Sequence, residues 1–111
     1  MVCLLLSQIT IDSVNSLISA GYKVLFVDVR SEDFYKTFPI IPKAINLPYD
    51  RILEGYNPPR GYDFYITVCG CTRGGIGLKA AELLNSRGFK ALWLRRDGKE
   101  IENKEDNVSG E

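Results

Sequence analysis

The hydrophobic positions of this chain fall into two kinds of pattern. Continuous apolar runs of strand length, rich in β-branched and aromatic residues, occur at 24–27, 64–68 and 91–94. Such runs are typical of parallel strands that are buried on both faces. A further short apolar run at 2–6 predicts another buried strand, and 44–48 reads as a short extended piece.

Helices are predicted between these strands from spacing and from cap residues. Thr10 precedes a segment, 11–20, in which apolar residues recur at helical spacing, and Gly21 suits its end. Ser31 is placed to cap a short helix at 32–37. One or two helical turns are expected at 49–55, and a longer helix at 78–87.

Strands that alternate with helices predict an α/β fold, a three-layer domain with a mostly parallel central sheet flanked by helices. Ligands of such sheets bind at the carboxyl ends of the strands. Asp28 and Arg30 follow one predicted central strand, and Cys71 follows another. The pattern therefore places the candidate chemistry of the chain at one edge of the sheet.

The length of 111 residues suits one domain. We expect that domain at 1–98, followed by a polar, loosely held tail at 99–111. The formal net charge of zero gives no electrostatic reason to expect nucleic acid or an anionic membrane as the main partner.

The cysteine count is three, which argues against a disulfide framework and favours a reducing compartment. The apolar run at 2–6 is too short for a signal-peptide core or a membrane span. Together these features predict a cytoplasmic protein.

The chain contains no histidine, which excludes Cys-His and Ser-His catalysis and histidine-ligated zinc.

The strongest chemical signal is Cys71, which stands between a predicted strand and a glycine-rich loop that leads into a helix. Backbone N–H groups of such a loop, together with the helix dipole, bind anions and favour a thiolate. The structural alternative is a buried cysteine that ends a strand. Cys69 fits a core position better, with a resolving thiol as the alternative role.

Three segments, in this order, resemble motifs of the rhodanese (thiosulfate sulfurtransferase-like) family. The first carries an Asp-hydrophobic-Arg stretch, the second an Ile-Pro-x-Ala-Ile-Asn-Leu-Pro stretch, and the third a Cys-x-x-Gly loop: 28–34, 41–48 and 71–77. Counted back from Gly88 and Phe89, the nucleophile of the family falls on Cys71.

The resemblance implies that Cys71 takes a sulfane sulfur from a small donor such as thiosulfate, or from a persulfide. The sulfur then passes to a thiophilic acceptor, with a protein thiol among the candidates. The resemblance implies neither a cofactor nor a metal. It assigns substrate binding to the loop residues, Thr72, Arg73, Gly74, Gly75, Ile76 and Gly77, and support of the loop to Asp28 and Arg30.

The loop departs from the family at its end, where Ile76 and Gly77 replace an Arg-Ser pair. Arg73 is a candidate source of the missing positive charge. Four aromatic residues are candidates for the wall of a pocket, with ordinary packing as their alternative role: Phe34, Tyr35, Phe38 and Tyr56.

Three other functions stay open. One is a noncatalytic rhodanese-like module that binds a partner protein. A thiol redox protein using Cys69 and Cys71 is the second, although the short spacing strains a bridge between them. The third is a cysteine-dependent phosphatase or arsenate reductase, which the glycine at position 77 disfavours because the arginine clamp for an oxyanion is missing.

Overall fold

The computed structural model describes residues 8–70 and 75–95 of the chain. Within them lies a five-stranded sheet with the strand order β1-β5-β4-β2-β3, and every pairing in it is parallel. In chain order the elements are β1 (Gln8–Ile9), α2 (Ile11–Ser19), β2 (Val24–Asp28), α3 (Glu32–Thr37), β3 (Ile45–Asn46), α4 (Tyr49–Leu53), β4 (Phe64–Val68), α5 (Gly75–Ser86) and β5 (Ala91–Leu94).

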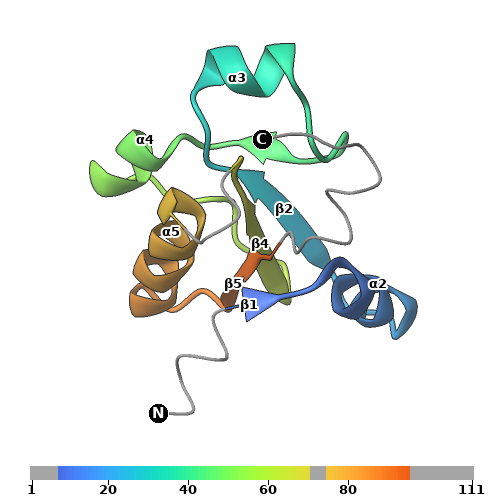
Figure 1. Ribbon diagram of the computed structural model, residues 1–111. Helices are drawn as coiled ribbons and strands as arrows, with labels where there is room; N and C mark the ends of the chain where they lie inside the picture. Colours follow the sequence, from blue (N-terminus) through green and yellow to red (C-terminus); the bar gives the residue numbers. More distant parts are fainter. Residues whose placement is uncertain (1–7, 71–74, 96–111) are drawn as a thin grey trace.

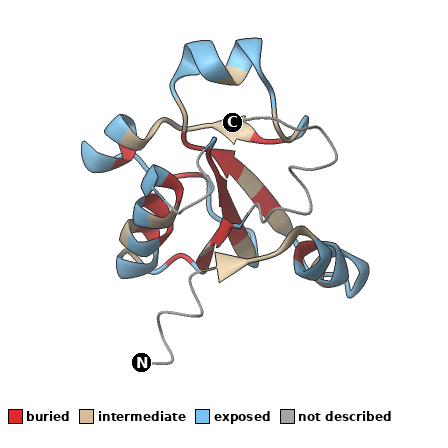
Figure 2. Ribbon diagram, in the orientation of Figure 1, coloured by how far each residue is buried: buried red, intermediate tan, exposed pale blue. Residues whose placement is uncertain are grey.

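The sheet is the middle of three layers (Figure 1). Helix α2 covers one face, and α4 and α5 cover the other. Side chains of β2 alternate between the faces, as a pleated strand requires, so that Leu25 and Val27 pack toward α5 while Val24 and Phe26 pack toward α2. Figure 2 shows the result, with buried residues concentrated in the central strands and on the inner side of α5.

The predicted caps are confirmed. The hydroxyl of Thr10 accepts a hydrogen bond from the backbone N–H of Ser13, and that of Ser31 accepts one from the N–H of Phe34. Gly21, just beyond α2, has a φ of 99°, a backbone conformation that suits glycine.

The predicted central strands are confirmed, with β2 one residue longer than expected. Strand β1 was not predicted, because its two residues show no pattern of their own. The strand expected at 2–6 and the tail at 99–111 lie outside the described residues. None of the described helices is long and apolar enough to span a bilayer.

The predicted start of the long helix was wrong, because α5 begins at Gly75 rather than at residue 78. Glycines at 75 and 77 favour a loop, but Gly77 lies inside the helix, where its missing side chain permits close packing. A Cβ atom at Gly77 would lie 2.6 Å from Cδ1 of Trp93 and 2.7 Å from Sγ of Cys69. The backbone of α5 is also bound directly, because the buried hydroxyl of Thr67 donates a hydrogen bond of 2.7 Å to the carbonyl oxygen of Gly77.

We therefore expect Gly77→Ala to destabilise the protein by about 2 kcal/mol, since it overpacks a contact that has no spare room. Chemical denaturation monitored by circular dichroism measures the change. Gly70→Ala is the matched control, because a Cβ there would meet its nearest atom, Cδ of Arg30, at an ordinary 3.9 Å. Equal stability of the two variants would contradict the close-packing account.

Candidate active site

The carboxyl ends of β2 and β4 lie side by side at one edge of the sheet. Asp28 is in register with Val68, and the backbone N–H of Val29 donates to the carbonyl oxygen of Val68 at 3.0 Å. The segment that follows β2 is therefore held against the segment that leads from β4 toward residue 71. Helix α3 lies beyond this edge of the sheet (Figure 1).

An ion pair between Asp28 and Arg30 organises the segment after β2. Nη2 of Arg30 lies 2.8 Å from one carboxylate oxygen of Asp28, and Nε lies 2.9 Å from the other. The backbone N–H of Arg30 also donates to this carboxylate, at 3.1 Å. Both side chains are almost fully buried, with 1% of Asp28 and 10% of Arg30 exposed. Such a two-point, charge-assisted contact fixes both distance and orientation.

The same segment is held from its other side by Asn46 of β3. The side-chain amide of Asn46 donates to the carbonyl oxygens of Asp28 and Arg30, at 3.1 and 3.0 Å. Two backbone bonds extend this contact, from Leu47 to Asp28 and from Tyr49 to Val29. Asn46 was missed as a positioning residue in the sequence, where only its place in the second resembling segment marked it.

The loop that the sequence singles out is described only in part. Cys71, Thr72, Arg73 and Gly74 lie outside the described residues. Gly75 and Ile76 form the exposed start of α5, and Gly77 is buried. Cys69 is buried in the core, as predicted, with 1% of its surface exposed. The segment with the candidate nucleophile thus runs between the carboxyl end of β4 and the amino end of α5.

The start of α5 provides a favourable site for negative charge. The backbone N–H groups of its first turn have no partners within a helix, and the helix dipole is positive at this end. No acidic residue lies in that first turn. An anion held by the preceding segment would therefore meet a positive potential.

A cavity of about 570 Å³ opens beside the start of α5. Most of its surface is apolar, and it is lined by Arg30, Ser31, Phe34, Phe38, Gly70 and Ile76. A second cavity of about 320 Å³ lies toward α4 and shares Ser31 and Ile76 with the first. Of the four aromatic candidates, Phe34 and Phe38 line the larger cavity, and Tyr35 and Tyr56 line neither.

The resolved pKa shifts belong to a surface pair on α3 and not to the candidate site. A hydrogen bond and the charge of Lys36 lower the pKa of Glu32, and the same contacts with Glu32 raise the pKa of Lys36. The two groups are joined at 2.9 Å in an exposed position. Among residues 8–70 and 75–95, no cluster of three potential metal ligands occurs.

Comparison with known proteins gives matches only among solved structures. No family model and no curated protein matches the chain. A rhodanese homolog from the extremely thermophilic bacterium Thermus thermophilus matches at 27% identity with a TM-score of 0.61, over 79% of this chain and 92% of its own. A rhodanese-like domain protein from Staphylococcus aureus matches at 27% identity with a TM-score of 0.64, over 80% and 84%.

The chain has the rhodanese-like fold. A third match, the human single-domain sulfurtransferase, is 23% identical with a TM-score of 0.65 and covers 90% of this chain and 98% of its own. The three matches extend over most of the chain, in which helices flank a five-stranded parallel sheet. The resemblance of the sequence to rhodanese-like proteins is therefore confirmed at the level of fold.

Within this rhodanese-like fold, the structure brings together Asp28, Arg30, Gly70 and Ile76 from three separate elements and their connections. The stem of Arg30 lies beside Gly70, and its guanidinium group is bound to Asp28. The sequence did not predict the apolar cavity as a whole, although it indicated Phe34 and Phe38 as candidates for the wall of a pocket. Its remaining apolar side chain, Ile76, comes from a distant part of the sequence.

We expect Asp28→Ala to lower the free energy of unfolding by about 3 kcal/mol, because it leaves the guanidinium of Arg30 buried without its partner charge. Urea denaturation measures the change. Glu32→Gln, in the exposed pair with Lys36, is the control and should leave stability almost unchanged. A loss below about 1 kcal/mol for Asp28→Ala would show that the pair does not hold this segment.

Proposed function

We propose that this protein is a sulfurtransferase that carries a sulfane sulfur as a persulfide on Cys71. The observation that carries the proposal is the arrangement of the described residues that flank this cysteine in the sequence. Strand β4 ends at Val68, α5 begins at Gly75, and Gly70 lies beside Arg30 of the buried Asp28–Arg30 pair, in a rhodanese-like fold. One of the structural matches is itself a sulfurtransferase.

In the first half-reaction, the thiolate of Cys71 attacks the outer sulfur of a donor such as thiosulfate. A new S–S bond forms, the S–S bond of thiosulfate breaks, and sulfite leaves with the electron pair. In the second half-reaction, an acceptor thiolate attacks the terminal sulfur of the persulfide. The electron pair of the broken bond returns to Cys71 as a thiolate, and no external oxidant or reductant is needed.

The protein would stabilise the negative charge that the sulfur of Cys71 carries before and after the transfer. Backbone N–H groups of residues 72–77 and the positive end of the α5 dipole would stabilise both the thiolate and the persulfide. Asp28 and Arg30 act as positioning residues, because their ion pair holds the neighbouring segment and leaves the reacting sulfur to the loop. Gly77 lets α5 pack closely against Trp93 and Cys69, and so fixes where the N–H groups of the first turn of α5 lie.

The decisive measurement is the intact mass of reduced protein after incubation with thiosulfate and removal of the donor. We expect wild type to gain about 32 Da, one sulfur atom, and Cys71→Ala to gain nothing. Cys69→Ala is the matched control, because Cys69 is two residues away but buried in the core, and it should gain the sulfur like wild type.

Two outcomes would overturn this assignment. If Cys71→Ala still gains about 32 Da, the sulfur is carried by another residue. If wild type gains no mass from thiosulfate or from an organic persulfide, the chain is not a sulfur carrier. A noncatalytic rhodanese-like binding module would then be the better description.

A further inference from the structure

Phe34 of helix α3 and Phe38, the residue that ends this helix, expose their side chains to solvent. Phe34 and Phe38 are 57% and 59% exposed, and no residue of α3 is buried. The helix is anchored by another aromatic residue, Tyr35, whose hydroxyl donates to the carbonyl oxygen of Ala44 at 2.7 Å. Tyr35 thus links α3 to the domain while Phe34 and Phe38 stay exposed, and Figure 2 shows that most of this helix is exposed.

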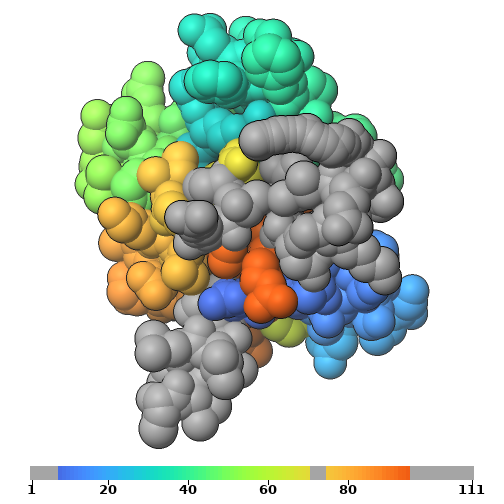
Figure 3. All heavy atoms as spheres, in the orientation of Figure 1, coloured from blue at the N-terminus to red at the C-terminus, as the bar shows by residue number. Residues whose placement is uncertain are grey.

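The two phenylalanines form one wall of the cavity beside the start of α5. Their ring centroids are 6.1 Å apart, with a tilt of 36° between the ring planes. Ile76, at the start of α5, lines the same cavity. Figure 3 shows α3 and α5 on a common face of the molecule. At about 570 Å³, this cavity is of a size that holds small organic molecules.

The residues that line the cavity flank the proposed nucleophile in the sequence. Two of its lining residues, Gly70 and Ile76, lie one residue before and two residues after the segment 71–74. Its polar edge is formed by Arg30 and Ser31, next to the positive end of α5. The positive end of α5 would favour an anionic sulfur at this edge, while an attached carbon skeleton would face Phe34 and Phe38.

The chemistry of this lining disfavours an inorganic dianion as its main occupant. Thiosulfate has no apolar surface to bury, and it would lose hydration against two phenylalanines and an isoleucine. The charge of Arg30 is already balanced by the carboxylate of Asp28 at 2.8 Å. An aromatic or branched aliphatic thiol, in contrast, gains by burying its carbon atoms.

We propose that the cavity of Phe34, Phe38 and Ile76 binds the body of an organic thiol, and that such a thiol, or its persulfide, is the substrate. This proposal rests on the sulfurtransferase function proposed above. The thiolate of the bound molecule attacks the terminal sulfur of the Cys71 persulfide, the S–S bond to Cys71 breaks, and Cys71 leaves as a thiolate. The product is the organic persulfide, and the reverse direction loads the protein.

Binding is tested first, with a probe that cannot transfer sulfur. Benzyl methyl sulfide is titrated into the wild-type protein, and amide chemical shifts are followed by nuclear magnetic resonance. We expect saturable shifts in α3 and at the start of α5, with affinity reduced about fivefold or more in Phe34→Ala and in Phe38→Ala.

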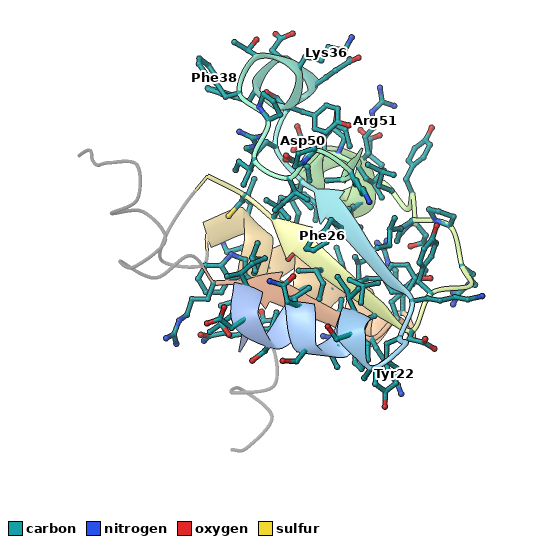
Figure 4. The ribbon with its side chains drawn as sticks, turned by 90° about the vertical axis from the view of Figure 1, so that its right-hand side faces the viewer. Tyr22, Phe26, Lys36, Phe38, Asp50 and Arg51 are labelled. Atoms are coloured by element: carbon teal, nitrogen blue, oxygen red, sulfur yellow. The ribbon has the colours of Figure 1, made fainter. Side chains whose placement is uncertain are left out.

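Tyr22→Ala is the matched control for these variants. Tyr22 is also an exposed aromatic residue, at 48%, but it lies at the opposite end of the molecule from Phe38 (Figure 4). Its removal should leave the affinity unchanged. Absence of saturable shifts, or an equal effect of all three substitutions, would overturn the proposal. So would concentration-dependent dimerisation that is lost in Phe34→Ala, because a second copy of the chain would then be the occupant.

Transfer is tested second, on protein already loaded with sulfur. The loss of about 32 Da is timed with benzyl mercaptan and with 2-mercaptoethanol at equal thiolate concentration. We expect benzyl mercaptan to react about tenfold faster, and Phe34→Ala to abolish this preference. Equal rates in wild type would refute the substrate assignment.

The two experiments separate the failure of this proposal from the failure of the proposed function. If the protein never takes up sulfur but binds benzyl methyl sulfide through Phe34 and Phe38, the sulfurtransferase function fails and the cavity stands as a binding site without that chemistry. If sulfur is taken up on Cys71 but the probe does not bind, the function stands and the substrate assignment fails.

Discussion

The close contact between α5 and the sheet at Gly77 is the constraint on which the candidate site depends. A helix reaches this distance from a strand only where a side chain is missing, and here Trp93 and Cys69 occupy the space that a Cβ would need. The hydrogen bond from Thr67 to the carbonyl oxygen of Gly77 also restricts the orientation of α5, since it joins β4 to the first turn of this helix. With both elements fixed, the described residues on either side of the candidate nucleophile, Gly70 and Gly75, are also held in place.

The Asp28–Arg30 pair fixes the segment that follows the neighbouring strand, β2. A buried ion pair gains little net stability over apolar packing, but its geometry is specific because two parallel hydrogen bonds set the orientation of both groups. Asn46 completes this arrangement by binding two backbone carbonyls of the same segment. Asp28 of β2 and Asn46 of β3 thus hold the segment that follows β2 from two sides.

Much of this architecture was predictable from the sequence. Apolar runs located β2, β4 and β5, and Thr10 and Ser31 located two helix starts, because each signal is local. The start of α5 was predicted at residue 78 instead of Gly75. In a sequence, a glycine that close packing requires cannot be distinguished from a glycine that a turn requires. The cavity could not be predicted, because whether Phe34 faces solvent or the core depends on where α3 lies relative to Ile76.

The packing that requires Gly77 also places an optical reporter beside the candidate site. Trp93 is the only tryptophan of the chain, and it is almost fully buried against the first turn of α5. Its indole N–H makes no hydrogen bond with any other residue in 8–70 or 75–95. Indole emission depends on the polarity and the quenching groups around the ring. Movement of the helix start would therefore change the fluorescence of the native protein, without any label attached to it.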